Sequence, residues 1–160
     1  MNLSKIEKKL ISFKTPEGRG DIKIIKKFNK KFKFIDESYN ANPLSMMSAI
    51  NNINYYNVDK NHRKLVFLGD MLELGTKSKK FHRALAITIN KSNIDKVFVC
   101  GKYIRETFNY LSTNKQGKIF KKITDAYDHF SKFLHNKDLL MVKGSHATGL
   151  NQFSKYIKKG

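Results

Sequence analysis

Three polar segments of the chain carry the side chains best suited to binding chemistry. DESYNAN spans residues 36–42, GDMLELG spans residues 69–75 and VKGSHA spans residues 142–147. Each begins where a short apolar run typical of a β-strand ends. Ligands of sheets built from β-α-β units gather at the carboxyl ends of the strands. We therefore expect the three segments to lie along one edge of a sheet, with Glu37, Asn40 and Lys143 close together.

The first segment suits a nucleoside. Asp36 and Glu37 can accept hydrogen bonds from ribose hydroxyls, as an acid does at the end of a dinucleotide-binding strand. Asn40 and Asn42 each offer a donor and an acceptor, the pair needed to read a purine edge. The competing interpretation is structural, because Asp36 and Asn42 are also typical caps of a corner and of a helix. The residues alone leave both interpretations open.

The other polar positions also allow both a functional and a structural interpretation. Arg19 lies between two glycines and could bring its guanidinium to a phosphate or a ribose, or be an ordinary linker arginine. In GDMLELG the apolar residues could plug the sheet or line a ligand, and we favour the plug. Lys143 and Ser145 follow a strand and precede a helix, where a carboxylate or phosphate can bind. The alternative is a tight turn with Ser145 as its cap and His146 incidental.

The periodicity of apolar residues predicts the elements that position these segments. A helix is expected over residues 3–13, and TPEGRG then interrupts the chain. A β-hairpin follows over residues 21–36, and Asn42 with Pro43 predicts the start of a helix that runs to about residue 54. Strands and helices then alternate. The expected strands are residues 64–69, 95–101, 117–123 and 138–144, and the expected helices are residues 77–91, 102–111, 125–134 and 150–157.

This alternation predicts an α/β fold with a mostly parallel sheet and helices on both faces, preceded by a β-hairpin and a leading helix. The 160 residues suit one compact domain. No apolar run approaches the roughly 20 residues of a membrane span, and the first residues are too polar for a signal peptide. We therefore expect a cytoplasmic chain. The single cysteine, Cys100, can form no internal disulfide and is interpreted as a small apolar residue.

The formal net charge of +19 raises the question of nucleic acid. Arginine is the residue favoured for bidentate phosphate and base contacts, yet the basic residues are mainly lysines spread along the chain. The arginines are Arg19, Arg63, Arg83 and Arg105. We favour solvated lysines and expect no nucleic acid, with attraction of small anions such as nucleotides as a further interpretation. A non-enzymatic basic α/β module that binds RNA or an acidic partner stays the alternative.

Several motifs of independent enzymes are absent from the sequence. There is no GxxxxGK[ST] phosphate loop, no GxGxxG fingerprint, no HExxH zinc motif and no GxSxG elbow. We therefore assign no catalytic residue and no metal ligand to this chain. Unaided hydrolysis of a nucleoside triphosphate is also unsupported.

The ordered set GRG, IDESYNANPLSM, VFLGDMLELG with His82 following, and VKGS resembles the C-terminal domain of the Mur ligase family. Within that family it is most similar to the ligases that add D-Ala-D-Ala. The resemblance implies a Rossmann-like domain over residues 17–160. It also implies that residues 1–16 are the remnant of a preceding central ATPase domain.

The activity implied by the resemblance is ATP-dependent amide ligation in peptidoglycan synthesis, which joins D-Ala-D-Ala to UDP-N-acetylmuramoyl-tripeptide through an acyl phosphate. The family's phosphate loop, magnesium ligands and UDP-sugar domain precede the motifs found here. The Mg²⁺ ligands are therefore expected in a central domain, and this chain alone is expected to be inactive. Its expected partners are ATP, the two substrates and the central and N-terminal domains, with the chain a monomer.

The resemblance also implies roles for individual residues. Arg19 and Glu37 would contact ATP near its ribose and phosphates, with Asp36 supporting the corner. The adenine would be lined by Tyr39, Asn40 and Asn42. The dipeptide or its acceptor would be faced by Asp70, Leu72, Lys143, Ser145 and His146. The family usually has arginine at the last of these positions, so an imidazole there holds less charge at neutral pH.

Overall fold

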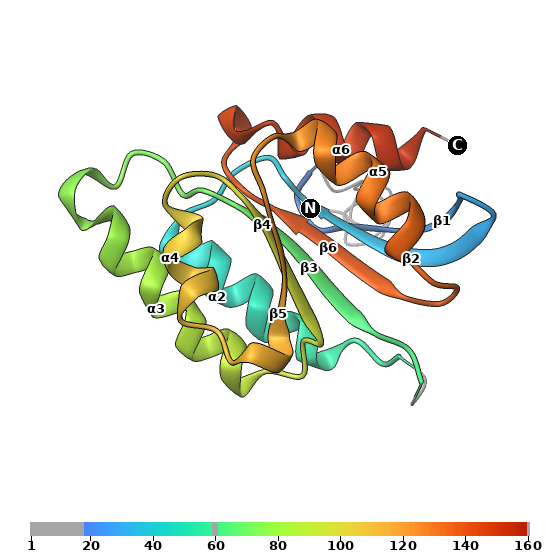
Figure 1. The fold of residues 1–160 in the computed structure, drawn as a ribbon, viewed down its shortest axis with the longest axis horizontal. Coiled ribbons are helices and arrows are strands. Elements are labelled where there is room, and N and C mark those ends of the chain that lie inside the picture. The colour runs from blue at the N-terminus through green and yellow to red at the C-terminus, as the bar shows by residue number, and fades with distance from the viewer. Residues whose placement is uncertain (1–17, 59–60, 160) are drawn as a thin grey trace, which may run out of the picture.

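A six-stranded sheet forms the centre of the computed structural model, which describes residues 18–58 and 61–159 (Figure 1). The strands are β1 Asp21–Lys27, β2 Lys30–Glu37, β3 Lys64–Gly69, β4 Lys96–Cys100, β5 Gln116–Phe120 and β6 Leu139–Lys143. Their order across the sheet is β1-β2-β6-β3-β4-β5, and only the β1–β2 pair is antiparallel. The predicted α/β class with a mostly parallel sheet is confirmed. The helix expected over residues 3–13 lies outside the described residues, and the domain boundary stays a prediction.

The predicted hairpin is formed by β1 and β2, which pair from Asp21 opposite Asp36 to Lys27 opposite Lys30. Phe28 and Asn29 make the two-residue turn with φ of 56° and 57°. Positive φ at both positions is typical of a type I′ turn, whose twist matches that of the strands it joins. The hairpin therefore fixes the register that brings the end of β2 to the carboxyl edge of the sheet.

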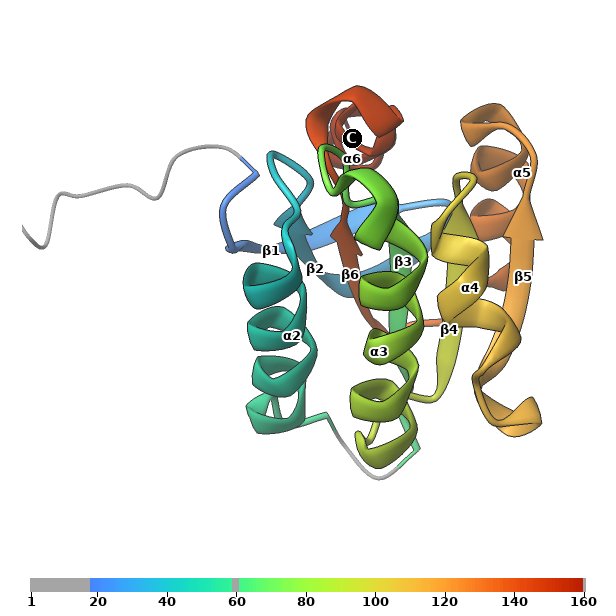
Figure 2. The ribbon, with the colours of Figure 1, turned by 90° about the vertical axis from the view of Figure 1, so that its left-hand side faces the viewer.

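Helices cover both faces of the sheet (Figures 1 and 2). One face carries α2 Pro43–Asn52, α3 Ser78–Lys91 and α4 Ile104–Asn109, and the other carries α5 Ile123–Phe133 and α6 Leu150–Lys158. Short 3₁₀ turns are Ile53–Tyr55, Gly75–Lys77, Thr113–Lys115 and His146–Thr148. Alternate residues of β3 serve the two cores: Val66 and Leu68 pack toward α2, α3 and α4, while Leu65 and Phe67 pack toward α5 and α6.

The start of α2 follows the sequence prediction. The Asn42 side chain accepts a hydrogen bond from the Ser45 amide at 2.8 Å, and Ser45 Oγ accepts one from the Asn42 amide at 3.1 Å. Pro43 occupies the first helical position, where its missing N–H would have had no partner in the helix. Asn42 therefore acts as a helix cap.

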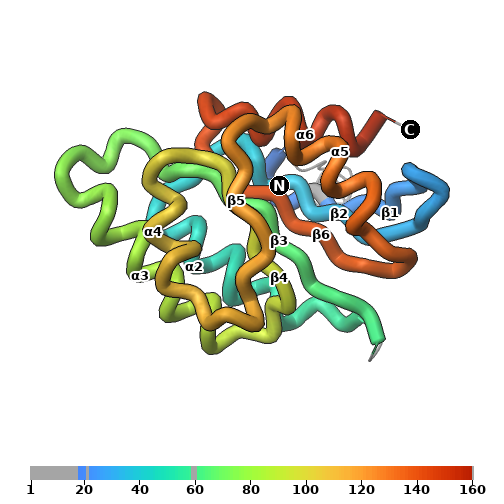
Figure 3. Tube along the Cα trace, viewed as in Figure 1, coloured from blue at the N-terminus to red at the C-terminus, as the bar shows by residue number. Residues whose placement is uncertain are grey.

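The path of the chain makes the segments after neighbouring strands diverge at the centre of the carboxyl edge. After β2 the chain builds β3, β4 and β5 through helices on one face, then returns through α5 on the other face and places β6 between β2 and β3 (Figure 3). The segment after β6 consequently runs toward α6, whereas the segments after β2 and β3 run toward α2 and α3. Such a divergence of neighbouring strands is the usual ligand position in open α/β sheets.

Candidate functional site

Glu37 and Lys143 are neighbours at the carboxyl ends of β2 and β6. Lys143 Nζ lies 3.0 Å from Glu37 Oε2 and donates to the Asn40 carbonyl oxygen at 3.1 Å. The Lys143 side chain is 2% exposed and that of Glu37 27%. The three residues that the sequence predicts at one edge thus lie together. Lys143 is occupied by protein oxygens, while Glu37 Oε1 has no hydrogen-bond partner among the described residues and remains an acceptor.

Asp36 is buried beneath this corner. Its Oδ1 accepts hydrogen bonds from the Ser38 amide at 3.1 Å and the Ser38 hydroxyl at 2.6 Å, and its Oδ2 lies 2.7 Å from Lys158 Nζ. Burial alone would raise the pKa of Asp36, but the hydrogen bonds from Lys158 and Ser38 outweigh it and lower that pKa. Because both oxygens are engaged, Asp36 holds the corner in place.

Arg19 is presented by two glycines in left-handed conformations, Gly18 at φ 76° and Gly20 at φ 85°. The Gly20 amide donates to the Asp36 carbonyl at 2.8 Å, and the Tyr39 amide donates to the Gly18 carbonyl at 3.2 Å. These bonds hold the segment against the end of β2. The Arg19 guanidinium carbon consequently lies 4.5 Å from the centre of the Tyr39 ring.

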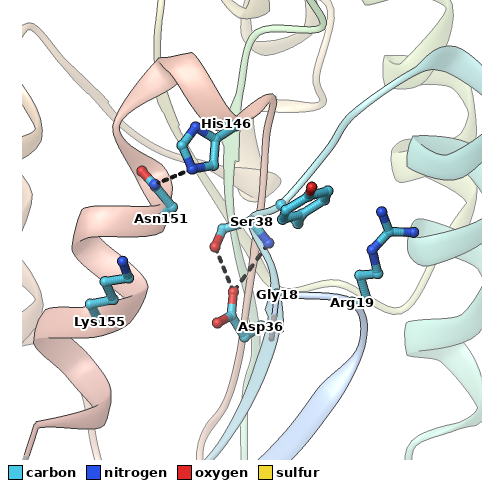
Figure 4. Close-up of a pocket in the computed structure, with 8 residues that line it drawn as sticks. Gly18, Arg19, Asp36, Ser38, His146, Asn151 and Lys155 are labelled. Carbon is cyan, nitrogen blue, oxygen red and sulfur yellow. Dashed lines mark hydrogen bonds between the residues drawn. The ribbon is translucent and has the colours of Figure 1, made fainter. Parts of the chain in front are cut away.

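A cavity of about 430 Å³ opens beside this pair, and we call it the Arg19 cavity. Figure 4 shows Arg19 on one side and Lys155 on the other, with Asp36 and Ser38 between them. His146 Nε2 lies 2.9 Å from Asn151 Nδ2. The cavity is lined by Gly18, Arg19, Asp36, Ser38, Tyr39, His146, Asn151 and Lys155. It thus combines one aromatic ring, two cations and several hydrogen-bonding groups.

Asp70, at the end of β3, is bound differently. Its carboxylate accepts hydrogen bonds from the amides of Lys102 at 2.9 Å, Tyr103 at 2.9 Å and Ile104 at 2.7 Å, at the start of α4. A side chain at Gly101 would come within 2.4 Å of Asp70 Oδ1, so glycine is required there. Asp70 therefore joins β3 to α4, and three backbone donors already occupy its charge.

The loop over residues 69–75 both packs into the core and lines a cavity. Met71 is fully buried in the core beneath α2, α3 and α4, whereas Leu72 is 37% exposed. His82 Nε2 accepts a hydrogen bond from the Met71 amide at 2.9 Å, and His82 Nδ1 donates to the Ser78 carbonyl at 2.8 Å. Burial lowers the pKa of His82. A neutral imidazole therefore fixes this loop to α3.

A second cavity, of about 590 Å³, is lined by Asp70 and Leu72 together with residues that follow β4, β5 and β6. Ser145 is buried and directly precedes His146 of the Arg19 cavity and Ala147 of the second cavity. Its Oγ donates to the Ala41 carbonyl at 3.3 Å and accepts from the Leu72 amide at 3.1 Å. Ser145 thus ties the loops after β2, β3 and β6 together.

The predicted site residues fall into three groups. Arg19, Asp36, Tyr39 and His146 line the Arg19 cavity, and Asp70 and Leu72 line the second cavity. Glu37, Asn40, Lys143 and Ser145 lie at the hydrogen-bonded corner after β2 and β6. Asn42 caps α2 instead of facing either cavity, and the Asn40 side chain accepts from the Ala41 amide at 2.8 Å. His146, placed with the substrate residues by the resemblance, lies in the Arg19 cavity, 6.1 Å from Tyr39 between ring centres.

Sequence reasoning missed Ser38, Asn151 and Lys155 in the Arg19 cavity. Asn151 and Lys155 are four residues apart on α6, so their shared helix face was visible in the sequence. What the sequence did not show is that this face of α6 lies beside the end of β2.

Within residues 18–58 and 61–159, no group of three or more His, Cys, Asp or Glu side chains could hold a metal ion. No helix of that part of the chain is long and apolar enough to cross a membrane.

Comparison with known families gives a match over residues 22–146, to the Mur ligase, glutamate ligase domain. The chain therefore belongs to the Mur ligase family. This match covers β2 to β6 and thus the strand ends that build both cavities.

Relatives in the family are UDP-N-acetylmuramoyl-tripeptide--D-alanyl-D-alanine ligases. That of Rickettsia prowazekii is 30% identical over 89% of this chain and 30% of its own length, and that of Bacillus subtilis is 31% identical over 76% of this chain and 24% of its own. The MurF structure from Acinetobacter baumannii matches all of this chain and 34% of its own with a TM-score of 0.82 at 23% identity. The structure of the MurF ligase of Thermotoga maritima in complex with ADP matches 92% of this chain and 32% of its own, with a TM-score of 0.72 at 23% identity. The chain thus spans about a third or less of these proteins.

Proposed function

We propose that this chain is the C-terminal, nucleotide-closing part of an ATP-dependent ligase that joins D-Ala-D-Ala to UDP-N-acetylmuramoyl-tripeptide in peptidoglycan synthesis. In the proposed reaction ATP phosphorylates the peptide carboxylate, the dipeptide amine attacks the resulting acyl phosphate, and phosphate leaves. The chain would act as a cytoplasmic domain beside a central ATPase domain that supplies the phosphate loop and the Mg²⁺ ligands. We propose the boundary between the two near residues 16 and 17.

The observation that carries this proposal is the Arg19 cavity together with Glu37 Oε1, which has no hydrogen-bond partner among the described residues. A purine can stack on the exposed face of Tyr39, and the Arg19 guanidinium over the same ring adds a planar cation that suits a phosphate. Glu37 Oε1 can accept from a ribose hydroxyl because Lys143 occupies only Oε2. A cavity of about 430 Å³ also lies within the usual range for small-molecule sites.

The proposed contribution of the chain is closure. An acyl phosphate reacts with water, so a domain that covers the nucleotide and excludes water protects the intermediate. Asp36, Ser145 and Lys143 would hold the closing surface rigid because each is buried and hydrogen-bonded. Arg19, Glu37 and Tyr39 would provide the contacts to the nucleotide.

A fusion protein tests the proposal. The C-terminal part of the Rickettsia prowazekii relative is replaced by this chain, and phosphate release is measured with ATP, UDP-N-acetylmuramoyl-tripeptide and D-Ala-D-Ala. We expect release that requires both substrates, and a KM for ATP raised about tenfold by Arg19→Ala or Glu37→Ala, as expected for the loss of one charged contact. Lys79→Ala, on the exposed side of α3, is the matched control.

A folded fusion that releases no phosphate while the unaltered relative does so would overturn the proposal. An activity that both site variants leave unchanged would instead remove Arg19 and Glu37 from the nucleotide site.

A further inference from the structure

The second cavity at the carboxyl edge is strongly basic. Its lining includes four cationic side chains and a single carboxylate. Lys102 and Arg105 come from the segment after β4, and Lys121 and Lys122 come from the segment after β5. None of its lining residues also lines the Arg19 cavity. The two cavities are therefore separate sites on the same edge.

The cavity's own carboxylate does not neutralise these cations. Asp70 is buried, and its oxygens accept from the three amides at the start of α4. Within the described ranges, no carboxylate lies within 4.0 Å of the charged nitrogens of the four cations. Glu106, which follows Arg105, pairs with Arg83 at 3.1 Å, and Asp125 accepts from the Lys122 backbone amide at 3.3 Å. Within the part of the chain that the structure describes, the positive charge facing the cavity thus has no carboxylate counter-ion.

Two further features favour an anion here. Arg105 Nε donates to the Gly101 carbonyl at 3.1 Å, which orients the guanidinium and leaves its terminal nitrogens available. The eleven-residue helix α5 begins at Ile123 in the cavity wall, so the positive end of its dipole adds to the same field. Apolar walls from Leu72, Ile123 and Ala147 strengthen that field because they exclude water.

We propose that this second cavity is a binding site for a compact anion that carries at least two negative charges, either phosphoryl or dicarboxylate. One negative charge would leave most of the four cations unneutralised, whereas a dianion can contact both loops at once. This inference is independent of the nucleotide contacts proposed for the Arg19 cavity.

Chemical-shift mapping of the ¹⁵N-labelled 160-residue chain tests the inference with pyrophosphate, succinate and acetate at matched ionic strength. We expect pyrophosphate or succinate to shift the amides of residues 101–105 and 121–123 in a saturable way, at least tenfold more tightly than acetate. Tighter binding of pyrophosphate assigns the site to phosphoryl groups, and tighter binding of succinate assigns it to dicarboxylates.

Paired variants provide the control. Lys121→Gln with Lys122→Gln removes two of the four cations and should weaken binding about tenfold or more, since each charged contact contributes to it. Lys79→Gln with Lys80→Gln makes the same change of net charge at an adjacent exposed pair on α3 and should leave binding unchanged.

Three results would each overturn the inference. These are acetate binding as tightly as the dianions, shifts confined to residues outside the cavity, and equal weakening by the two paired variants. Titration with ADP, read at Gly18, Arg19 and Ser38, reports separately on the Arg19 cavity. Failure of one site therefore leaves the other testable.

Discussion

The two cavities at the carboxyl edge are built around buried aspartates that are held in different ways. Asp36, beside the Arg19 cavity, is bound by the side chains of Lys158 and Ser38 and by the Ser38 amide. Asp70, in the second cavity, is bound entirely by backbone amides. In both cases protein groups bind the carboxylate, and within the described residues it forms no ion pair with the cations that line the cavity. These two buried aspartates thus shape the cavities without presenting their charge to a ligand.

The largest loss of stability is expected from the removal of Asp70, which backbone amides bind. Asp70→Ala leaves three amides at the start of α4 without this acceptor, and that of Ile104 is buried. Hydrogen bonds to charged groups contribute about 1.5–3 kcal/mol each, so we expect a loss of at least about 3 kcal/mol in the free energy of unfolding. Urea denaturation measures it.

Asp128→Ala is the control for that variant. Asp128 is 73% exposed and pairs with Lys132 on the surface of α5. Its removal should change stability by less than about 0.5 kcal/mol. Equal losses for the two variants would show that the amides of residues 102–104 do not depend on Asp70.

A smaller loss of stability is expected at Asp36, which is held mainly by side chains. Lys158→Met removes one charge-assisted hydrogen bond from Asp36 but leaves both bonds from Ser38, so we expect a loss of about 2 kcal/mol in the free energy of unfolding at pH 7. The pKa of Asp36 is lowered in the folded state. Its contribution to stability is therefore present above the unfolded carboxyl pKa of about 3.9 and is lost as the pH falls through the folded value.

Carboxyl NMR provides the measurement. In the Lys158→Met variant the pKa of Asp36 should rise, because burial then acts with less opposition. An unchanged pKa would mean that Lys158 does not hold this carboxylate.

Much of this architecture could be predicted from the sequence. Alternating apolar runs gave the strands and helices, and Asn42 with Pro43 marked the start of α2. These signals are local, because hydrophobic periodicity and capping involve residues a few positions apart. The position of β6 between β2 and β3 is not local, and no pattern in DLLMVKG indicates it.

Two buried lysines also could not be predicted from local patterns in the sequence. Lys64 and Lys115 are buried, although their sequence context suggests solvated side chains. Lys64 Nζ donates to the carbonyls of Ile53 and Asn54, and Lys115 Nζ donates to those of Ser92 and Ile94. Burial lowers the pKa of both lysines. These acceptors lie 10 to 23 residues away along the chain, so only the tertiary structure reveals them.

The candidate site was predictable to the same degree. The strand ends of β2, β3 and β6 were found because each carries a polar segment after an apolar run. Asn151 and Lys155 were missed because α6 joins the Arg19 cavity through packing, and the cations of the second cavity were missed because its two loops carry no recognisable motif.

A smaller effect on stability is expected from His82, which binds the loop over residues 69–75. The folded state holds His82 neutral, with its pKa below the ordinary value because of burial. The unfolded state binds the proton more readily, so stability should fall as the pH drops below about 6.5. One proton limits the slope to about 1.4 kcal/mol per pH unit. Burial also lowers the pKa of His129, which adds a slope of the same sign. His82→Gln should therefore remove only the part of the slope that His82 contributes, whereas His146→Gln, at an exposed position, should leave the slope unchanged.

The smallest effect on stability is expected at Tyr39. The ring is 49% exposed, so Tyr39→Ala should change the free energy of unfolding by less than about 1 kcal/mol, as is usual for surface positions. The same variant should weaken ADP binding about tenfold, because stacking of a base on an aromatic ring contributes about 1–3 kcal/mol. Tyr55→Ala, at a residue after α2 that is 83% exposed, should leave ADP binding unchanged.

Pyrophosphate binding at the second cavity should also be unaffected by Tyr39→Ala, since the ring lines only the Arg19 cavity. Loss of both ligands in this one variant would mean that the two cavities act as a single site.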